Sequence, residues 1–449
     1  MAKYFGTDGF RGEANVDLTA MHAFKIGLFL GWYYGHDHRA SIVIGKDTRR
    51  SSYMFEDALA AGIAAAGADA YLLHVTTTPS VAYVARTDDF DCGVMISASH
   101  NPFHDNGIKL INGKGEKMED EVIADVEAYL DGEWEVPYAT GGEIGRVIDY
   151  AAGRNRYIGY LISLARCSYR GMRVGLDCSN GSTWQIAKNV FDALGADTVV
   201  INNKPDGLNV NLDCGSTHIK GLQRLVKEQG LDIGFAFDGD ADRCLAVDEN
   251  GEIVNGDQIM YVAARYMQEK GSLGDTKVVT TIMSNFGLYK ALDELGIGYE
   301  KTAVGDKYVY ENMVANDHLI GGEQSGHIIF RKYATTGDGL ITAIKIMECV
   351  LMQKTTLSAL AAPCRMYPQV LKNVVVTDKD TAMNDPTVQE AVKACEERLG
   401  ESGRVLLRKS GTEPVLRVMA EATSRSACEE NVDAIIAAMR ERGLLVKVK

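Results

Sequence analysis

The sequence predicts an α/β protein of four domains: three related α/β domains with mixed, mostly parallel sheets, followed by a smaller C-terminal α+β domain. Three observations predict this architecture. A unit of strand, polar turn, helix, glycine stop and second strand occurs three times along the chain. The glycines that end the three helices, Gly67, Gly195 and Gly296, are far enough apart for each unit to belong to a separate domain. At 449 residues, the chain is also too long for one hydrophobic core.

Each repeated unit predicts a crossover between neighbouring parallel strands, with helices covering the sheet. The expected elements are strand 41–45, helix 54–66 and strand 71–75; strand 173–176, helix 184–194 and strand 198–201; and strand 277–280, helix 286–295 and a further short strand. The last part of the chain has a different pattern. It predicts strand 374–376, helix 388–399, strands 404–407 and 415–419, and a final helix.

Breaks between domains are expected at the glycine pair after Thr140, near residues 248–251 and near Pro363. The predicted domains are therefore 1–148, 149–250, 251–366 and 367–449.

Composition excludes several classes of function. A formal net charge of −14 disfavours nucleic-acid and anionic-membrane partners. Nine cysteines without a CxxC spacing suit a reducing compartment, and no apolar run approaches the roughly 18 residues of a membrane span. We expect a cytoplasmic protein, since the first residues also lack the apolar segment of a signal peptide. In so acidic a chain, an anionic substrate would have to bind where positive side chains are gathered locally.

Three aspartates, Asp238, Asp240 and Asp242, follow directly after the apolar run 233–237. Carboxylates this close repel one another unless a cation neutralises them, and hard divalent cations prefer oxygen ligands. The run predicts a buried strand, so the aspartates would lie at its carboxyl end, where open α/β sheets bind ligands. The sequence therefore predicts a magnesium site that needs further ligands to be complete.

Other interpretations of the aspartates stay open at this point. A calcium loop of EF-hand type would use Glu249 as its twelfth residue, but Arg243 occupies the position of the required glycine, and a strand precedes the loop. A strand that ends in Asp-x-Asp also resembles phosphatases in which Asp238 would itself accept a phosphoryl group. Solvated acids in an ordinary turn are the structural alternative.

A serine loop, Ile96–Pro102, follows the apolar residues 93–95. Ser99 is a candidate nucleophile because His100 can hydrogen-bond or carry a proton beside it, and Lys109 supplies a cation ten residues later. A small-residue turn without function is the alternative for this segment alone.

Two further segments are suited to a phosphorylated, hydroxylated ligand. Glycines frame Glu323 in the segment Gly321–His327, so its carboxylate can approach two hydroxyl groups closely. The segment Arg408–Pro414, with Arg404 before it and Arg417 after it, combines hydroxyls, a glycine and several cations, as a phosphate-binding loop requires. A Walker loop is absent, so an ATP-driven kinase is not indicated.

These four segments, in this order and spacing, resemble the α-D-phosphohexomutase superfamily over the whole chain, and the opening Phe5–Gly12 is a fifth match. Within the superfamily, the opening, Gln324 and the segments 304–309 and 335–339 are most similar to the bacterial branch that acts on glucosamine phosphates. One departure is Lys409, where the C-terminal loop often has proline. This change affects the expected affinity for phosphate more than the type of reaction.

The resemblance implies a role for each segment. Ser99 would be a phosphoserine and the fourth metal ligand, beside the magnesium ligands Asp238, Asp240 and Asp242. The other implied catalytic residues are Arg11 and Arg243 as cations, Lys109 and His327 as general base and acid, and His100 as support of the serine loop. The implied substrate-binding residues are Glu323 and Ser325 for the sugar, and Arg408, Ser410, Gly411, Thr412 and Arg417 for the distal phosphate. A lysine base would need nearby positive charge to lower its pKa.

The implied reaction interconverts glucosamine 6-phosphate and glucosamine 1-phosphate through a 1,6-bisphosphate, which is intermediate and activator, for UDP-N-acetylglucosamine synthesis. Glucose or mannose phosphate is the alternative substrate within the superfamily. The resemblance also suggests a homodimer that acts on a phosphosugar and binds neither nucleic acid nor membrane.

Overall fold

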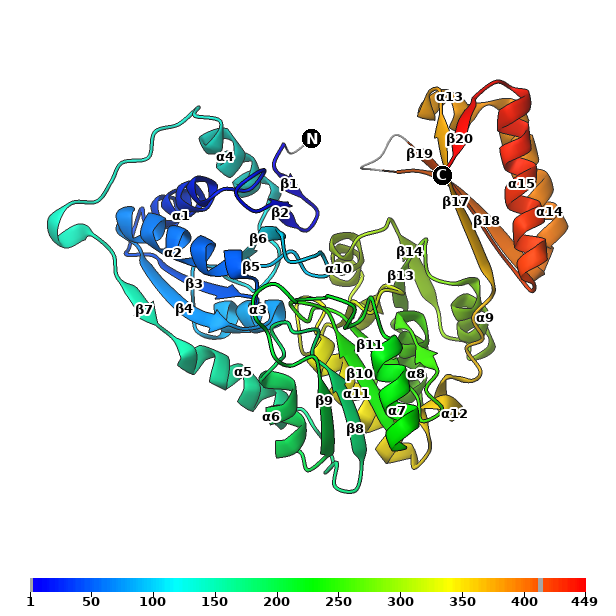
Figure 1. The fold of residues 1–449 in the computed structure, drawn as a ribbon, viewed down its shortest axis with the longest axis horizontal. Coiled ribbons are helices and arrows are strands. Elements are labelled where there is room, and N and C mark those ends of the chain that lie inside the picture. Colours follow the sequence, from blue (N-terminus) through cyan, green and yellow to red (C-terminus); the bar gives the residue numbers. More distant parts are fainter. Residues whose placement is uncertain (1–2, 411–414) are drawn as a thin grey trace. The chain divides into compact units, whose positions relative to one another are not determined.

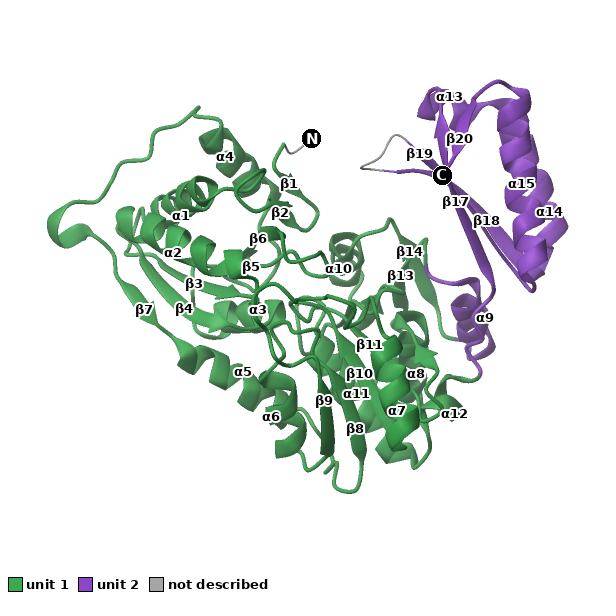
Figure 2. Cartoon of the chain, viewed as in Figure 1, with its two compact units in different colours: residues 1–283, 297–362 green, residues 284–296, 363–449 purple. Residues whose placement is uncertain are grey.

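The computed structural model describes residues 3–410 and 415–449 of the chain (Figure 1). It has two compact units (Figure 2). Unit 1 comprises residues 1–283 and 297–362, and unit 2 comprises residues 284–296 and 363–449. Three mixed sheets belong to unit 1, and a fourth sheet, which is entirely antiparallel, belongs to unit 2. The predicted α/β class, with a smaller C-terminal domain of different type, is confirmed.

The first sheet has seven strands in the order β1-β2-β6-β5-β3-β4-β7. Its strands are β1 (Phe5–Gly6), β2 (Gly9–Glu13), β3 (Ser41–Lys46), β4 (Asp69–Val75), β5 (Cys92–Ile96), β6 (Asp105–Asn112) and β7 (Val147–Asp149), and the surrounding helices are α1 (Ala20–Tyr34), α2 (Arg50–Ala65), α3 (Thr78–Thr87) and α4 (Asp120–Leu130). A short 3₁₀ helix, η1 (Gly141–Glu143), precedes β7.

Two glycines allow α1 and α2 to pack closely. A Cβ atom at Gly62 of α2 would lie 2.1 Å from the backbone oxygen of Phe24, and one at Gly27 of α1 would lie 2.3 Å from that of Leu59. Any larger residue would therefore push the helices apart.

The second sheet has five strands in the order β12-β11-β10-β8-β9. Its strands are β8 (Arg173–Asp177), β9 (Asp197–Ile201), β10 (Ile233–Phe237), β11 (Cys244–Val247) and β12 (Ile253–Val254), and its helices are α5 (Ala151–Ser163), α6 (Ile186–Ala193) and α7 (Lys220–Gln229). The helix α7 packs on β8 and β10 and lies next to them in Figure 1.

The third sheet has four strands in the order β14-β13-β15-β16. Its strands are β13 (Val278–Thr281), β14 (Tyr299–Thr302), β15 (Ile320–Gly322) and β16 (Ile328–Phe330), and its helices in unit 1 are α8 (Gly256–Glu269), α10 (Asp306–Ala315), α11 (Gly339–Gln353) and α12 (Leu357–Ala361). The predicted helix 286–295 is present as α9 (Phe286–Glu294), but it groups with unit 2. A polar contact links its start to the fourth sheet, where the Phe286 N–H donates to Glu421 Oε2 (2.9 Å).

The three sheets of unit 1 share one topology. In each, two parallel pairs lie side by side (β4-β3-β5, β9-β8-β10 and β14-β13-β15), and an antiparallel strand follows next to the last of them (β6, β11 and β16). The sequence repeat predicted only the first strand–helix–strand part of this unit. The antiparallel strand next to it was not predicted. Because all three sheets have this strand, the three loops that lead into it occupy equivalent positions in their sheets.

Unit 2 contains the antiparallel sheet β18-β19-β17-β20 with helices on it. Its elements are β17 (Gln369–Val376), β18 (Gly403–Lys409), β19 (Val415–Ala422) and β20 (Leu445–Val448), with α13 (Lys379–Asn384), α14 (Pro386–Leu399), η2 (Gly400–Ser402) and α15 (Arg425–Glu441). The apolar side chains of β17 and β19 and of α14 and α15 form one core.

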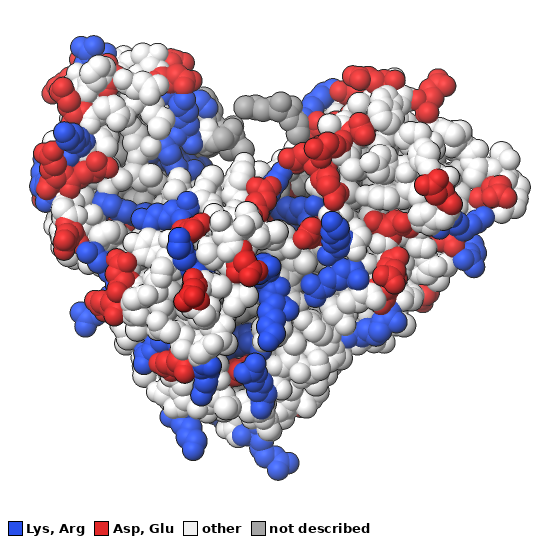
Figure 3. All heavy atoms as spheres, turned by 180° about the vertical axis from the view of Figure 1, so that it is seen from behind, with Lys and Arg blue, Asp and Glu red and all other residues white. Residues whose placement is uncertain are grey.

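Charge is distributed unevenly over the surface. Figure 3 shows Lys and Arg side chains gathered over the lower middle of the face seen from behind, despite the net charge of −14. All nine cysteines lie within the described residues, and none of them forms a disulfide bond there. In that part of the chain, the helices lack the length and apolar character that crossing a membrane would require.

Candidate active site

Three equivalent loops of unit 1 carry the predicted chemistry. The Ser99 loop joins β5 to β6, the aspartate turn joins β10 to β11, and the segment 323–327 joins β15 to β16. Each loop therefore begins at the carboxyl end of a parallel strand, the edge at which α/β sheets bind ligands.

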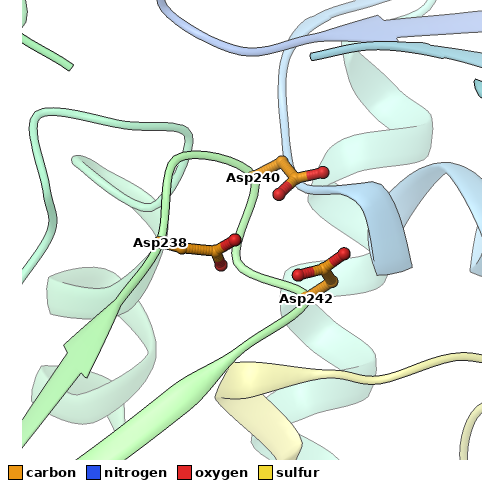
Figure 4. A group of neighbouring side chains, drawn as sticks. All are labelled: Asp238, Asp240 and Asp242. Carbon is orange, nitrogen blue, oxygen red and sulfur yellow. The ribbon is translucent and has the colours of Figure 1, made fainter. Parts of the chain in front are cut away.

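Asp238, Asp240 and Asp242 extend from one turn and lie together (Figure 4). Each offers a carboxylate oxygen that lies within 4.8 Å of those of the other two. All three side chains are buried, so they are not the solvated acids of an ordinary turn. Burial, together with the charges of Asp242 and Asp240, raises the pKa of Asp238 well above its usual value. Asp238 is therefore costly to ionise without a nearby cation.

The turn fits a magnesium ion. The Oδ1 atoms of Asp240 and Asp242 are buried and accept no hydrogen bond from the described residues. Unpartnered buried carboxylate oxygens are what a hard oxygen-binding cation satisfies. The preceding element is the strand β10, which agrees poorly with an EF-hand, because its calcium loop follows a helix.

Ser99 contacts this turn directly. Its Oγ donates a hydrogen bond to Asp238 Oδ2 (2.6 Å) and lies 3.4 Å from His100 Nδ1. The serine is fully buried and has a φ of 51°, in the left-handed region. For a residue with a Cβ atom this conformation costs roughly 1–2 kcal/mol, so the surrounding contacts must hold it.

Lys109, on β6, contacts the other two carboxylates of this turn. Its Nζ lies 2.7 Å from Asp240 Oδ2, 3.2 Å from Asp242 Oδ2 and 3.5 Å from Asp8 Oδ1. Burial alone would lower the pKa of Lys109, but these three carboxylates outweigh it and raise the pKa well above its usual value. A lysine base would need nearby positive charge to lower its pKa, whereas carboxylates dominate around Lys109 in this structure.

His327 lies buried beside the aspartate turn. The Gly337 N–H donates to His327 Nε2 (2.9 Å), so the proton of the neutral ring is on Nδ1, which lies 3.8 Å from Asp242 Oδ2. His100 is neutral near pH 7, because burial and the charges of Arg243 and Arg11 lower its pKa to about 4.

Two arginines border the site. Arg243 Nε lies 3.8 Å from Asp242 Oδ1, and Arg11 pairs with Asp8. Burial would lower the pKa of Arg243, but Asp242, Asp238 and Asp8 raise it. The Nε atoms of both arginines are buried without an acceptor among the described residues, so each retains a donor for an anionic group.

The third loop carries Glu323 and Ser325, the two residues predicted to contact the sugar. Glu323 Oε1 accepts a hydrogen bond from the Gly305 N–H (3.2 Å), and Ser325 is exposed. The Asp306 that follows Gly305 is held by Lys117 (2.7 Å), which ties the start of α10 to the loop after β6.

The predicted phosphate-binding residues belong to unit 2. Arg408 on β18 is the cross-strand neighbour of Arg417 on β19. The Nε atoms of both are buried and lack an acceptor among the described residues, and burial together with the charge of Arg417 lowers the pKa of Arg408. Like charges directly opposite each other destabilise a sheet, so this pair favours a bound anion. Ser410 is buried nearby in sequence, whereas Gly411 and Thr412 lie outside the described residues.

Arg404 differs from the expectation. Its Nε donates to Glu421 Oε2 (2.7 Å) and its Nη2 to the Ser284 backbone oxygen (2.5 Å). It therefore supports the fold of unit 2, and a buried carboxylate already neutralises its charge.

Inorganic phosphate is expected to raise the melting temperature of the wild-type protein, and Arg417→Gln should weaken this effect. Losing one charge-assisted partner should reduce phosphate affinity about tenfold, or roughly 1.4 kcal/mol. The measurement is thermal unfolding over a phosphate titration. Arg425→Gln is the matched control, because Arg425 is exposed on α15. An unchanged phosphate dependence in Arg417→Gln would contradict the site.

Several residues around Ser99 were missed by sequence reasoning. Asp47 and Arg49 follow β3, Thr78 starts α3, and Asn211 precedes α7. Thr78 Oγ1 donates to Asp240 Oδ2 (2.5 Å), and Asn211 Nδ2 donates to the Ser99 backbone oxygen (2.8 Å). A signal was present for the first pair: Asp47 and Arg49 lie at the carboxyl end of a predicted parallel strand, as Asp238 does.

Four protein-family models match consecutive parts of the chain. They are phosphoglucomutase/phosphomannomutase α/β/α domain I over residues 2–136, domain II over 155–251, domain III over 255–367 and the C-terminal domain over 371–438.

Two relatives named phosphoglucosamine mutase match nearly the full length. That of Lachnospira eligens is 66% identical over 99% of this chain and 100% of its own length, and that of Lachnoclostridium phytofermentans is 62% identical over 99% of both. Among solved structures, a phosphoglucomutase/phosphomannomutase family protein from Burkholderia thailandensis has a TM-score of 0.80 at 22% identity, covering 99% of this chain and 98% of that one. An Aspergillus fumigatus N-acetylphosphoglucosamine mutase in complex with GlcNAc-6P and magnesium has a TM-score of 0.70 at 20% identity, covering 99% and 96%.

Proposed function

From the membership of this chain in the phosphoglucomutase/phosphomannomutase family of α-D-phosphohexomutases, we infer that it interconverts glucosamine 6-phosphate and glucosamine 1-phosphate. The observation that carries the proposal is the 2.6 Å hydrogen bond from Ser99 Oγ to Asp238 Oδ2. It brings a serine nucleophile against a buried acidic turn that fits magnesium.

Ser99 is the phosphoryl carrier in this proposal. In the first step, the bond between Ser99 Oγ and phosphorus breaks, and a bond forms between that phosphorus and the free hydroxyl oxygen of the hexosamine phosphate. The hydroxyl proton leaves to a base, and the product is a 1,6-bisphosphate. After the bisphosphate turns over, its other phosphoryl group returns to Ser99 Oγ, which regenerates the phosphoserine and releases the isomeric monophosphate.

Asp238, Asp240 and Asp242 would hold magnesium, with the phosphoserine as a further oxygen ligand. A bound magnesium ion supplies positive charge beside the transferring phosphoryl oxygens. The Nε donors of Arg11 and Arg243, which lack acceptors among the described residues, support a role of these side chains on the same oxygens. Positioning and neutralisation of charge supply most of the catalysis in phosphoryl transfer.

Lys109 and His327 are the proposed proton-transfer pair. One of the two accepts the proton of the attacking hydroxyl, and the other donates a proton to the departing sugar oxygen. As the base, His327 would use its Nε2 lone pair, which accepts the Gly337 N–H, so the sugar hydroxyl would replace that N–H during the reaction.

The remaining roles follow the family pattern. Glu323 and Ser325 orient the sugar hydroxyls, and His100 supports the serine loop. Arg408, Ser410, Gly411, Thr412 and Arg417 hold the distal phosphate. We also propose the domain division 1–148, 149–250, 251–366 and 367–449, a homodimer, a cytoplasmic location, and activation by the hexosamine or glucose 1,6-bisphosphate.

Glucosamine specificity rests on the 66% and 62% identical relatives, which are named for that activity. We expect kcat/KM for glucosamine 1-phosphate to exceed that for glucose or mannose 1-phosphate by more than about tenfold, or roughly 1.4 kcal/mol of transition-state binding. Parallel steady-state kinetics on the three sugars measures this ratio. A ratio that favours glucose or mannose would show that glucosamine phosphate is not the preferred substrate. The proposed mutase chemistry would still stand.

A further inference from the structure

We propose that Asp47, Arg49 and Asn211 are positioning residues that hold both backbone polar groups of Ser99 and so keep its Oγ aligned for phosphoryl transfer. The inference rests on the proposed function. It concerns residues that the reaction scheme does not use, since none of the three contacts Ser99 Oγ among the hydrogen bonds of the site.

Arg49 directs its whole guanidinium group at the Ser99 loop and its own ion-pair partner. The side chain is fully buried, and its Nε donates to Asp47 Oδ2 (2.7 Å). Its Nη2 donates to the backbone oxygens of Ser99 and Asn101, both at 2.9 Å. Its Nη1 donates to the backbone oxygens of Pro102 and Asp105. All five N–H groups of the guanidinium are thus used, four of them on carbonyls between residues 99 and 105.

The same ion pair also reaches the amide of Ser99. Asp47 Oδ2 accepts a hydrogen bond from Ser97 Oγ (2.7 Å), and Ser97 Oγ in turn accepts the Ser99 N–H (2.9 Å). Ser97 is fully buried. One buried carboxylate–guanidinium pair therefore holds Ser99 from its N–H side through Ser97 and from its carbonyl side through Arg49.

Asn211, which lies between β9 of the second sheet and α7, also holds the backbone of Ser99. Its Nδ2 donates to the backbone oxygens of Ser99 (2.8 Å) and Asn101 (3.1 Å). The aspartate turn packs closely on the same carbonyl, as a Cβ atom added at Gly239 would lie only 2.5 Å from the Ser99 oxygen. The Ser99 carbonyl is thus the point where the serine loop, the aspartate turn and Asn211 meet.

These hydrogen bonds to the backbone of Ser99 matter for the proposed mechanism. Ser99 adopts a left-handed φ of 51°, which a non-glycine residue leaves readily when its contacts are removed. Ser99 must also gain and lose a dianionic phosphoryl group beside three carboxylates in every cycle. A rotation of its backbone would move Oγ away from the aspartate turn, and small misplacements of a reacting atom cost large factors in rate.

Asn211→Gly is the decisive variant. Asn211 itself has a φ of 58°, which glycine adopts without strain, so the substitution removes the amide donors and leaves the backbone conformation accessible. We expect kcat to fall about tenfold or more while KM stays within about twofold. The single-turnover rate of phosphoryl transfer from phosphorylated Ser99 to sugar phosphate should fall by the same factor as kcat.

Asn202→Gly is the matched control. Asn202 also has a left-handed φ, of 51°, and its side chain donates to Asp177 without touching Ser99. This control should lose a similar amount of thermal stability but retain kcat. Arg49→Lys is a second variant, in which a single ammonium replaces the five-donor fork, and a larger loss of kcat than in Asn211→Gly is expected.

The outcomes separate this inference from the proposed function. If wild-type protein carries phosphate on Ser99 and turns over, but Asn211→Gly retains kcat or changes only KM, the positioning role is overturned and the function stands. Equal losses of kcat in Asn211→Gly and Asn202→Gly would also overturn it, because general destabilisation would then explain both. If wild-type Ser99 is neither phosphorylated nor required, the proposed function fails and this inference fails with it.

Discussion

Ser99→Ala and Ser99→Gly are each expected to abolish mutase turnover, with a loss of roughly 10³-fold or more in kcat. Both variants remove the Oγ that donates to Asp238 and that carries the phosphoryl group in the proposed reaction. The glycine variant is needed because alanine keeps the strain of the left-handed backbone at this position, whereas glycine relieves it. Two variants that differ in stability but share the loss of activity would assign the loss to the missing hydroxyl.

The measurement is coupled kinetics together with intact-mass analysis and peptide mapping. Wild-type protein should carry one phosphate on the peptide that contains Ser99, and this phosphate should resist hydroxylamine. An acyl phosphate on Asp238 would be cleaved by hydroxylamine and would indicate aspartyl-phosphate chemistry. Ser163→Ala serves as the control for a serine-to-alanine change, because Ser163 is exposed at the end of α5. Near-normal turnover in Ser99→Ala would contradict the mechanism.

Asp240→Asn is expected to reduce kcat by roughly 10²-fold or more and to remove the response of the protein to magnesium. Asparagine has nearly the same shape but lacks the charge, and Asp240 Oδ1 is one of the two buried oxygens of the aspartate turn that have no donor among the described residues. In the wild type, magnesium should raise the melting temperature, because it relieves repulsion among three buried carboxylates and binds only the folded state.

Thermal unfolding and kinetics over a magnesium titration test this prediction, after treatment with a chelator. Asp275→Asn is the matched control, since Asp275 is exposed and the change removes the same charge. Activity should survive in calcium-free buffer with magnesium present. Chelated wild-type protein that retains full turnover would contradict the assignment of the acidic turn as a metal site.

Prediction from the sequence worked best where neighbouring residues carry the information. The repeated strand–helix–strand units produced β3, β8 and β13 and the helices after them, because hydrophobic periodicity and glycine stops are local properties. The location of the aspartate turn also followed from local pattern. An apolar run that ends in acidic residues places them at the carboxyl end of a buried strand, and the turn after β10 confirms this.

Contacts between distant segments were beyond such reasoning. The antiparallel strands β6, β11 and β16 carry no repeated motif, and their pairing depends on where the chain returns. The pKa of Lys109 is raised because Asp240 and Asp242 approach it from more than a hundred residues away in the chain. The ion pair of Arg404 with Glu421 likewise depends on how the strands β18 and β19 pair.

The sequence by itself determined the α/β class, the three repeated units and the residue types of the site, since periodicity, turn residues and acidic spacing are read along the chain. Only the tertiary structure decided how the site is assembled. It brought Ser99 to Asp238, surrounded Lys109 with carboxylates and enclosed the serine loop between Arg49 and Asn211. The physical reason is that electrostatic and hydrogen-bond energies depend on distance in space, and the folded sheets bring these groups within 3 Å although the chain separates most of them by many residues.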